Sequence, residues 1–426
     1  MTLPLTQIAQ WMDCIGCVEE VTEMFKAKSL PINWTWVKFG DIAKDRLIGL
    51  VRSSKEQSPS KKYPYIKMDS ILLDGSLNLE ITTNVDATDS ELERYTLQKG
   101  DFLFNTRNSH ELVGKTAVFN INEPNWLYNN NIMRIRFNDD INPYYLNLAF
   151  HSQLVRHQLE AAKNKTTSVC AIYDYQLVKL QIPLPPIATQ KRIAAILDKA
   201  DAVRRKRQEA IRLTEELLRS AFLEMFGDPV TNPKGWEMRK LDKLAKFVGG
   251  GTPSRKVPSY YQGDICWATP KDMGVDVLND TKEHITQEAI EQSATKLVNP
   301  DCLLIVVKSK VLGRRLPIAR TRVSTCFGQD LKAIVPYEAS ITRYLHRHLK
   351  FGERTLLEMA RGVNTEGLTL EHLRSYDVMI PTKAEIDKFV EIDTQVENSQ
   401  SKLKQTLADT DNLFNSLLQR AFRGDL

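Results

Sequence analysis

"LLRSAF" occupies Leu217–Phe222, and "LLQRAF" occupies Leu417–Phe422, close to the end of the 426-residue chain. These phrases lie 200 residues apart, and five further pairs of segments match in the same order at offsets of 196–202 residues. The pairs include "PINW" with "PKGW" and "KGDFLF" with "NPDCLLI". A period close to half the chain predicts two duplicated domains rather than a solenoid of short repeats.

The two halves share one internal order. Each begins with short β-like runs such as "DFLFNT" and "CLLIVV", turn residues and a few helical stretches, which together favour an α+β domain. Each domain ends at a proline-containing turn, "IPLPPIATQ" or "MIPTKAE", and a long helix follows. The predicted segments are an N-terminal extension without an assigned role (1–29), the domains (30–182 and 229–379) and the helices (183–228 and 380–426).

The two long helices are predicted to pair. Apolar residues alternate at spacings of three and four in both, which is typical of a coiled-coil seam. A pseudo-twofold axis relating duplicated halves would make the helices antiparallel, whereas the alternative has each helix packed on its own domain. The predicted fold is α+β, with two pseudo-repeated globular domains separated by two long antiparallel coiled-coil helices. The residues predicted at the helix-pair interface are Ile193, Ile196, Ala200, Val203, Leu217, Phe389, Ile392, Val396, Leu403, Leu413 and Leu417.

Composition narrows the class of protein but not its partner. Lysine and arginine total 58 against 53 acidic residues, and this net charge of +5 does not by itself indicate nucleic acid. No apolar run approaches the ~18 residues that span a bilayer, and the N-terminus lacks a signal-peptide pattern, so we expect a cytoplasmic protein. The six cysteines favour reduced thiols, and Cys14 and Cys17 lack the second pair that a structural zinc site needs.

Three stretches resemble the specificity subunits of type I restriction-modification systems. "IPLPPIATQKRIAAILDKAD" with "LTEELLRSAFLEMFGDP" looks like the central conserved region of that family. "GWEMRKLDKLAKFVGGGTPSRKVPSYYQGDICWATPKDM" resembles the start of its target recognition domains, and "LFNSLLQRAFRGDL" looks like its C-terminal end. The resemblance covers about residues 30–426, although the first domain lacks the "GGGTPSR" turn.

The resemblance implies a DNA-reading adaptor without an active site of its own. Each recognition domain would read one half of a split, asymmetric double-stranded site, and the helix pair would set the spacer. Two modification subunits would dock on the chain and carry S-adenosylmethionine chemistry on adenine. Where the system also restricts, two motor-nuclease subunits that use ATP with Mg would join. The resemblance implies no cofactor on this chain.

Basic and polar residues gather in turn-rich segments at corresponding places in the two domains, as a DNA reader requires. Arginine matches guanine edges and asparagine matches adenine edges through two-point contacts. For any one residue, the alternative is a solvated surface charge. The predicted DNA-binding residues are Arg52, Lys55, Lys61, Lys62, Tyr63, Lys67, Arg107, Asn108, Lys115, Lys163, Asn164, Lys165, Arg255, Lys256, Lys308, Lys310, Arg314, Arg315, Arg361 and Asn364.

Enzymatic alternatives find little support in the sequence. "ELVGKT" ends like a phosphate-binding loop, but position 109 is Ser109 where that motif needs glycine. The only Pro-Pro pair, Pro185-Pro186, lacks the flanking residues of an adenine methyltransferase motif. The seven histidines show no metal-ligand spacing, so no metal site is expected. Two alternatives stay open, a coiled-coil scaffold without DNA readout and a DNA-modifying enzyme with an unrecognised active site.

Overall fold

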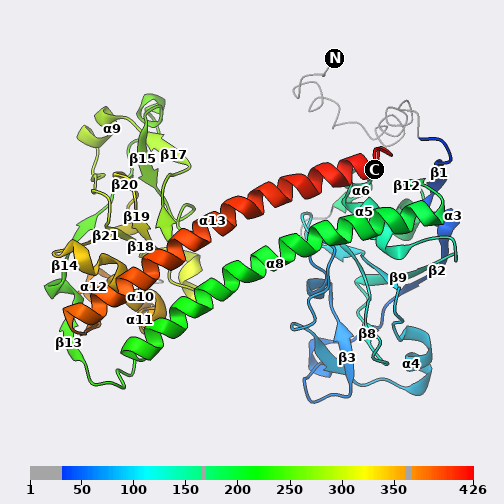
Figure 1. Ribbon diagram of the computed structural model, residues 1–426, viewed down its shortest axis with the longest axis horizontal. Helices are drawn as coiled ribbons and strands as arrows, with labels where there is room; N and C mark the ends of the chain where they lie inside the picture. The colour runs from blue at the N-terminus through cyan, green and yellow to red at the C-terminus, as the bar shows by residue number, and fades with distance from the viewer. Residues whose placement is uncertain (1–30, 166–168, 361–366) are drawn as a thin grey trace. The chain divides into compact units, whose positions relative to one another are not determined.

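The computed structural model describes residues 31–165, 169–360 and 367–426, so the predicted extension 1–29 lies outside the described part (Figure 1). Contacts divide the chain into two compact units. The first unit contains the chain up to Lys206 together with 407–426, and the second unit is Arg207–Thr406. Each unit holds one α+β domain and half of each long helix, α8 (Ile187–Phe226) and α13 (Lys383–Ala421).

The first unit is built on a four-stranded antiparallel sheet. Helices α5 (Pro143–His151) and α6 (Gln153–Ala161) pack on it, and their apolar residues share one core cluster with Phe102 and Phe104 of the sheet. The sheet order is β2 (Ala43–Ile48), β9 (Ile132–Phe137), β5 (Phe102–Asn105), β7 (Thr116–Val118). The other pairings are β4 (Thr83–Val85) with β3 (Tyr63–Ile66) and β8 (Leu127–Tyr128), and β1 (Thr35–Lys38) with β12 (Gln181–Leu184). Shorter helices are α3 (Phe39–Ile42), α4 (Asp89–Tyr95) and α7 (Asp174–Leu177).

The second unit repeats this plan with one strand added. Its main sheet is β14 (Ala245–Gly249), β21 (Leu331–Pro336), β18 (Leu303–Val306), β19 (Ile318–Thr321), β16 (Val277–Leu278). The other pairings are β17 (Glu283–Ile285) with β15 (Ile265–Ala268) and β20 (Thr325–Phe327), and β13 (Glu237–Lys240) with β22 (Asp377–Ile380). Its helices are α9 (Gln287–Glu291), α10 (Thr342–Phe351), α11 (Glu353–Ala360) and α12 (Leu370–Arg374). The predicted duplication of α+β domains is confirmed.

The long helices run antiparallel within each unit. In the second unit Phe389 packs on Phe222 and Phe226, with ring centroids 5.3 and 5.4 Å apart. Further along, the Gln400 amide donates to the Thr214 hydroxyl over 3.0 Å. In the first unit, the Arg204 guanidinium pairs with Asp411 at 2.7 Å and lies 4.7 Å from the Phe414 ring centroid. Residues closer to the C-terminus of α13 contact residues closer to the N-terminus of α8. The predicted antiparallel direction is therefore confirmed.

The predicted helix-pair seam is partly wrong. Val203, Leu217 and Leu413 are 44%, 59% and 57% exposed. Each helix must also pack on its domain, and this rotates the buried stripe of α8 to Leu218 and Phe222, which are 2% and 0% exposed. The other predicted interface residues are buried or half-buried, namely Ile193, Ile196, Ala200, Phe389, Ile392, Val396, Leu403 and Leu417.

Buried ion pairs attach α13 to the second domain. Asp393 and Glu397 of α13 are 2% and 9% exposed. Arg347 of α10 bonds Asp393 at 2.7 Å, and Arg320 of β19 bonds Glu397 at 2.7 Å. The network extends through Arg343 to both carboxylates, through Arg322 to Glu397, and through Arg347 and Lys350 to Asp276. We refer to these residues as the α13 ion network.

The first unit has a cavity at the position that corresponds to the α13 ion network. At the repeat offset of 196 residues, Asp201 of α8 corresponds to Glu397. Asp201 lines a cavity of about 640 Å³ together with Asp74, Tyr144 and Leu148. Tyr144 and Leu148 occupy α5 positions that correspond to Arg343 and Arg347 at an offset of 199 residues. The two units therefore hold their long helices by different means.

The position of the buried stripe on α8 suggests a comparison of two substitutions, one of a buried residue and one of an exposed residue. Phe222→Ala should lower the free energy of unfolding by about 3–5 kcal/mol, because the fully buried ring touches Phe226, Tyr344, Phe351 and Phe389. Leu217→Ala, on the exposed side, should change it by less than about 0.5 kcal/mol. Urea unfolding measures both. Equal losses would contradict the packing described.

Two buried histidines of α10 predict acid sensitivity. Burial lowers the pKa of His346 to about 4 and that of His348 to about 3. The unfolded chain takes up these protons below about pH 6.5, whereas the folded chain does not, so stability falls as pH drops from there toward 4. Each histidine should cost about 2 kcal/mol at pH 5. The difference between the urea midpoints at pH 7 and pH 5 should be smaller in His348→Gln than in the wild type. An equal difference in the two proteins would show that His348 is not a source of the acid sensitivity.

Candidate nucleic-acid interface

A small sheet in the first unit gathers four of the predicted DNA-binding residues. Its strands are ordered β10 (Asn164–Lys165), β11 (Cys170–Ala171), β6 (Arg107–Asn108). The register sets Ala171 between Asn164 and Arg107, and Cys170 between Lys165 and Asn108. Arg107 is exposed, and Asn108 is half-buried with its amide donating to the Asn105 side chain over 2.9 Å. Two segments more than 50 residues apart in sequence thus flank β11 in one small sheet.

The second unit has a corresponding basic segment after β18. Lys308, Lys310, Arg314 and Arg315 are all exposed, and they surround a short 3-10 helix, Lys310–Gly313. None of the four forms an ion pair with another residue of the described ranges. The backbone N–H of Leu368 donates to the Val307 carbonyl over 2.8 Å, as the Ile172 N–H donates to Thr106 in the first unit. Arg361 and Asn364 lie outside the described residues.

Several predicted cations of the first unit are engaged within the protein. Arg52 pairs with Glu91 at 2.8 Å, and Lys61 pairs with Asp86 at 2.6 Å. Lys115 donates to the Met68 carbonyl over 2.8 Å, and burial lowers its pKa. Lys163 donates to the His110 carbonyl over 2.7 Å, and Asn164 donates to Gln176 over 2.5 Å. These side chains tie loops together, so their contact with DNA stays a prediction.

The neighbouring segment offers a cation above an aromatic ring. Lys62 is exposed, with its ammonium 5.0 Å from the Tyr63 ring centroid. The Tyr63 ring itself is 9% exposed and packs with Tyr65, which makes it a core residue rather than a stacking surface. Lys55 is exposed and Lys67 half-buried.

Arg255 of the second unit is held by a fork of two short contacts. Its two terminal nitrogens lie 2.5 and 2.8 Å from the Glu283 carboxylate oxygens. The guanidinium also lies 4.1 Å from the Tyr261 ring centroid. The hydrogen bond from Arg255 lowers the pKa of Glu283. Lys256, the next residue, is exposed.

Sequence reasoning missed an exposed aromatic pair. Tyr173 and Tyr175 are 43% and 58% exposed, and their rings stack with centroids 5.9 Å apart and planes 10° apart. They follow β11 in sequence, separated from it by Ile172. Exposed aromatic rings are suited to stacking on bases. The sequence signal for this pair is the alternation of tyrosines in "YDY", Tyr173–Tyr175.

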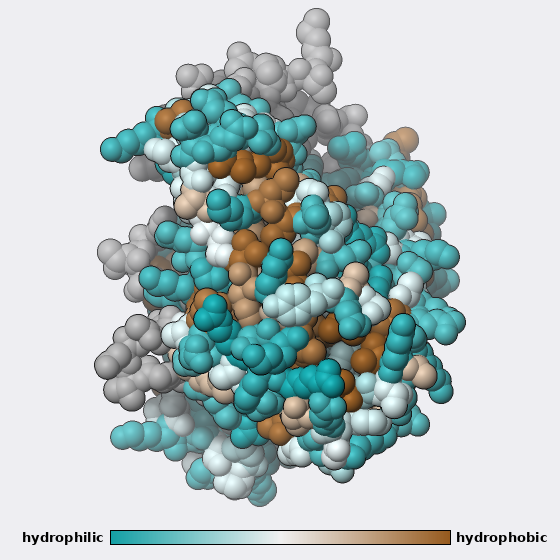
Figure 2. All heavy atoms as spheres, turned by 90° about the vertical axis from the view of Figure 1, so that its left-hand side faces the viewer, coloured by the Kyte–Doolittle hydropathy of each residue, from teal (hydrophilic) through white to brown (hydrophobic). Residues whose placement is uncertain are grey.

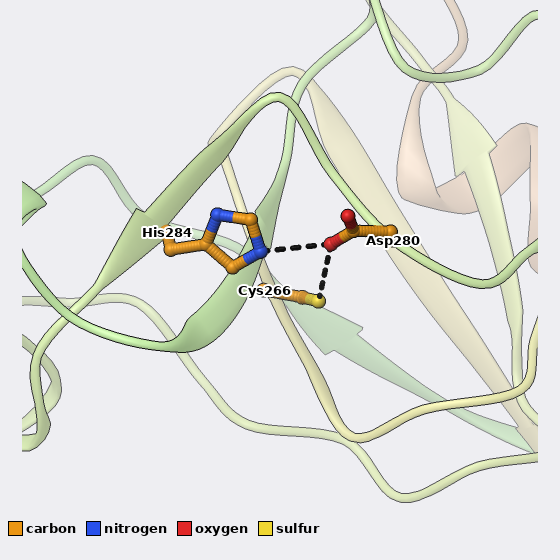
Figure 3. A group of neighbouring side chains, drawn as sticks. All are labelled: Cys266, Asp280 and His284. Carbon is orange, nitrogen blue, oxygen red and sulfur yellow. Dashed lines mark hydrogen bonds and ion pairs between the residues drawn. The ribbon is translucent and has the colours of Figure 1, made fainter.

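Sequence spacing also missed a group of three potential metal ligands. Cys266, Asp280 and His284 offer ligand atoms that all lie within 4.8 Å of one another (Figure 3). The spacings of 14 and 4 residues match no common motif, because the strand pairing of β15 with β17 is what brings Cys266 opposite His284.

Apolar surface does not dominate the face of the molecule drawn at the left of Figure 1. Figure 2 shows hydrophilic side chains over most of that face, with apolar ones between them. Across the described residues, no helix is long and apolar enough to cross a membrane.

Comparison with known proteins identifies the domain type. A family model for the type I restriction modification DNA specificity domain matches residues 31–214 and again 233–410. The EcoR124I/EcoR124II type I restriction enzyme specificity subunit of Escherichia coli is 32% identical over 232 residues, covering 52% of this chain and 56% of the relative. The MjaIX specificity subunit of Methanocaldococcus jannaschii is 25% identical, covering 42% of this chain and 39% of that relative. Each alignment thus spans less than two thirds of the relative.

A third relative aligns along nearly the whole chain. The putative type I restriction enzyme MjaX specificity subunit of M. jannaschii is 22% identical over 433 residues, covering 95% of this chain and 97% of the relative. Among solved structures, a type I restriction-modification S subunit from M. genitalium matches with a TM-score of 0.56 at 16% identity, covering 92% and 96% of the two chains. A chain from a structural study of type I R-M complex assembly matches with a TM-score of 0.50 at 22% identity, covering 93% and 100%. The structural matches show the shared fold.

Proposed function

This chain belongs to the family of type I restriction-modification DNA specificity domains, which it carries twice, and on that premise we propose that it is the DNA-binding specificity subunit of a type I restriction-modification complex. Each α+β domain reads one half of a bipartite, asymmetric site. The observation that carries the proposal is the second copy of the family domain, because two different readers in one chain suit two different half-sites. Exposed cations at corresponding places in both domains support it.

We further propose that α8 and α13 set the spacer between the half-sites. At 1.5 Å per residue, a 40-residue helix is about 60 Å long. Half-sites one turn of B-DNA apart lie ~34–36 Å apart, which is within that length. Neither helix contains proline or glycine, so each resists bending where a flexible linker would not.

The catalytic steps are assigned to partner subunits. Two modification subunits would dock on this chain and methylate adenine with S-adenosylmethionine, and two motor-nuclease subunits with ATP and Mg would join where the system restricts. The chain itself would act without a cofactor. The sequence supports this assignment because it lacks the methyltransferase and phosphate-binding motifs sought in it.

Methylation mapping tests the proposal directly. Deleting the gene from its host should abolish adenine methylation at one split motif, while other motifs persist. Exchanging residues 30–182 for the first recognition domain of another specificity subunit should change one half of that motif and leave the other half. An unchanged methylome, together with no co-purifying methyltransferase, would refute the function. A scaffold without DNA readout would instead bind a protein partner but show no salt-dependent DNA affinity.

The exposed cations after β18 predict a change in salt dependence. In the complex with its modification subunits, the triple variant Lys308→Ala, Lys310→Ala, Arg314→Ala should weaken DNA binding. The slope of log K against log salt should become shallower by up to about 3, since each lost phosphate contact removes about 0.9. Arg354→Ala is the matched control, because Arg354 is 83% exposed but pairs with Glu358 on α11. Equal effects of the two variants would reject this surface.

The fork between Arg255 and Glu283 predicts a gain of affinity. Glu283→Gln should tighten DNA binding about two- to fivefold, because an exposed ion pair worth about 0.5–1 kcal/mol no longer competes with phosphate for Arg255. Arg255→Gln should weaken binding, and the double variant should match Arg255→Gln. Fluorescence anisotropy with a duplex that carries the mapped motif measures all three. A Glu283→Gln variant that binds as wild type would show that Arg255 does not face DNA.

A further inference from the structure

Strand pairing in the second unit places two soft metal ligands opposite each other. Cys266 of β15 and His284 of β17 are direct partners in an antiparallel pair. Side chains of directly opposed residues lie on the same face of the sheet. Asp280, four residues before His284, turns its carboxylate into the space between them (Figure 3). Two neighbouring strands and the loop before β17 thus bring sulfur, nitrogen and oxygen close together.

The three ligand atoms are near enough to one another for a single zinc ion to reach them after a small adjustment, since all lie within 4.8 Å of one another. Zinc bonds of about 2.0–2.3 Å at tetrahedral angles separate neighbouring ligand atoms by about 3.3–3.6 Å. The Cys266 Sγ lies 3.5 Å from the Asp280 Oδ1. The His284 Nε2 lies 2.7 Å from the same oxygen, a hydrogen-bond distance, so the exposed carboxylate would have to move by about 0.6 Å to make room for the ion. We propose that Cys266, Asp280 and His284 form a binding site for Zn²⁺.

Access and ligand chemistry agree with zinc rather than with a harder ion. The Asp280 side chain is 71% exposed and that of His284 is 32% exposed, while Cys266 is 8% exposed. The ion would therefore approach from the solvent side and keep a water molecule as its fourth ligand. Thiolate with imidazole selects Zn²⁺ over Mg²⁺ or Ca²⁺, which prefer all-oxygen sites. On binding, the thiol proton passes to solvent, and the neutral imidazole of His284 carries its ring proton on Nδ1 so that Nε2 can bind the ion.

The ion would stabilise a segment next to the candidate DNA-contacting surface. The coordinated residues bracket Glu283, the carboxylate that holds Arg255. Fixing Asp280 and His284 fixes the backbone on both sides of Glu283. Zinc would then order the pairing partner of Arg255, although the metal site itself does not depend on DNA reading.

Cobalt titration tests the site with a visible signal. Full-length protein carrying Cys14→Ser and Cys17→Ser is stripped of metal with a chelator, and Co²⁺ is then added. The two substitutions remove the other closely spaced thiol pair. One equivalent of Co²⁺ should produce a thiolate-to-cobalt charge-transfer band, and one equivalent of Zn²⁺ should abolish it. Absence of the band in this background would overturn the proposal.

Matched variants separate coordination from folding. Cys266→Ser and His284→Gln should each remove the band, whereas Cys302→Ser, a change of a buried cysteine at the start of another sheet's strand, should retain it. Asp280→Asn changes an exposed side chain, so the protein should stay folded while cobalt affinity falls at least about tenfold. A band that survives in Cys266→Ser would assign the metal elsewhere. Asp280→Asn with unchanged affinity would reduce the group to a hydrogen-bonded cluster and reject the site.

Discussion

Two carboxylates on α13, Asp393 and Glu397, must keep their partners because both are buried. Removing one partner from a buried pair typically costs about 3–5 kcal/mol, since the remaining charge has no solvent to stabilise it. Arg320 on β19 and Arg343 on α10 reach these carboxylates from two different elements of the domain. A slip of α13 by one residue would break every pair at once. The network therefore fixes the register of the helix on the second domain.

The first unit attaches its long helix to the domain without such an ion network. Its corresponding helix segment contributes apolar side chains, Ile193 and Leu197, to the domain core. Apolar contacts are non-directional and tolerate small shifts, whereas bonded ion pairs specify one arrangement. Burial raises the pKa of Asp201, the counterpart of Glu397, despite nearby Arg204 and Arg205. The arginines that pair with Asp201 come from α8 itself, at 2.6 Å for Arg204 and 3.4 Å for Arg205, whereas those of Glu397 come from the domain.

The sequence predicted the repeat, the two α+β domains and the antiparallel helices, because each depends on periodicity that neighbouring residues carry. It misplaced part of the helix seam, because Leu217 and Leu218 differ by one position and only packing on the domain decides which is buried. The same distinction between local patterns and contacts made by the fold applies to the candidate site residues. Clusters of charge could be seen in the sequence, but the ion pair of Arg255 with Glu283 joins a loop residue to a strand residue 28 positions later. No local pattern encodes that contact.

The close of the chain lies against the beginning of its first domain. The Phe422 ring packs 5.2 Å from that of Tyr145, and a side chain at Gly424 would collide with Pro31. Arg192 donates to the carbonyl of Leu426 over 2.7 Å. The last turns of α13 and Phe422 thus belong to the core of the first domain, which is complete only when a segment from the far end of the sequence has joined it.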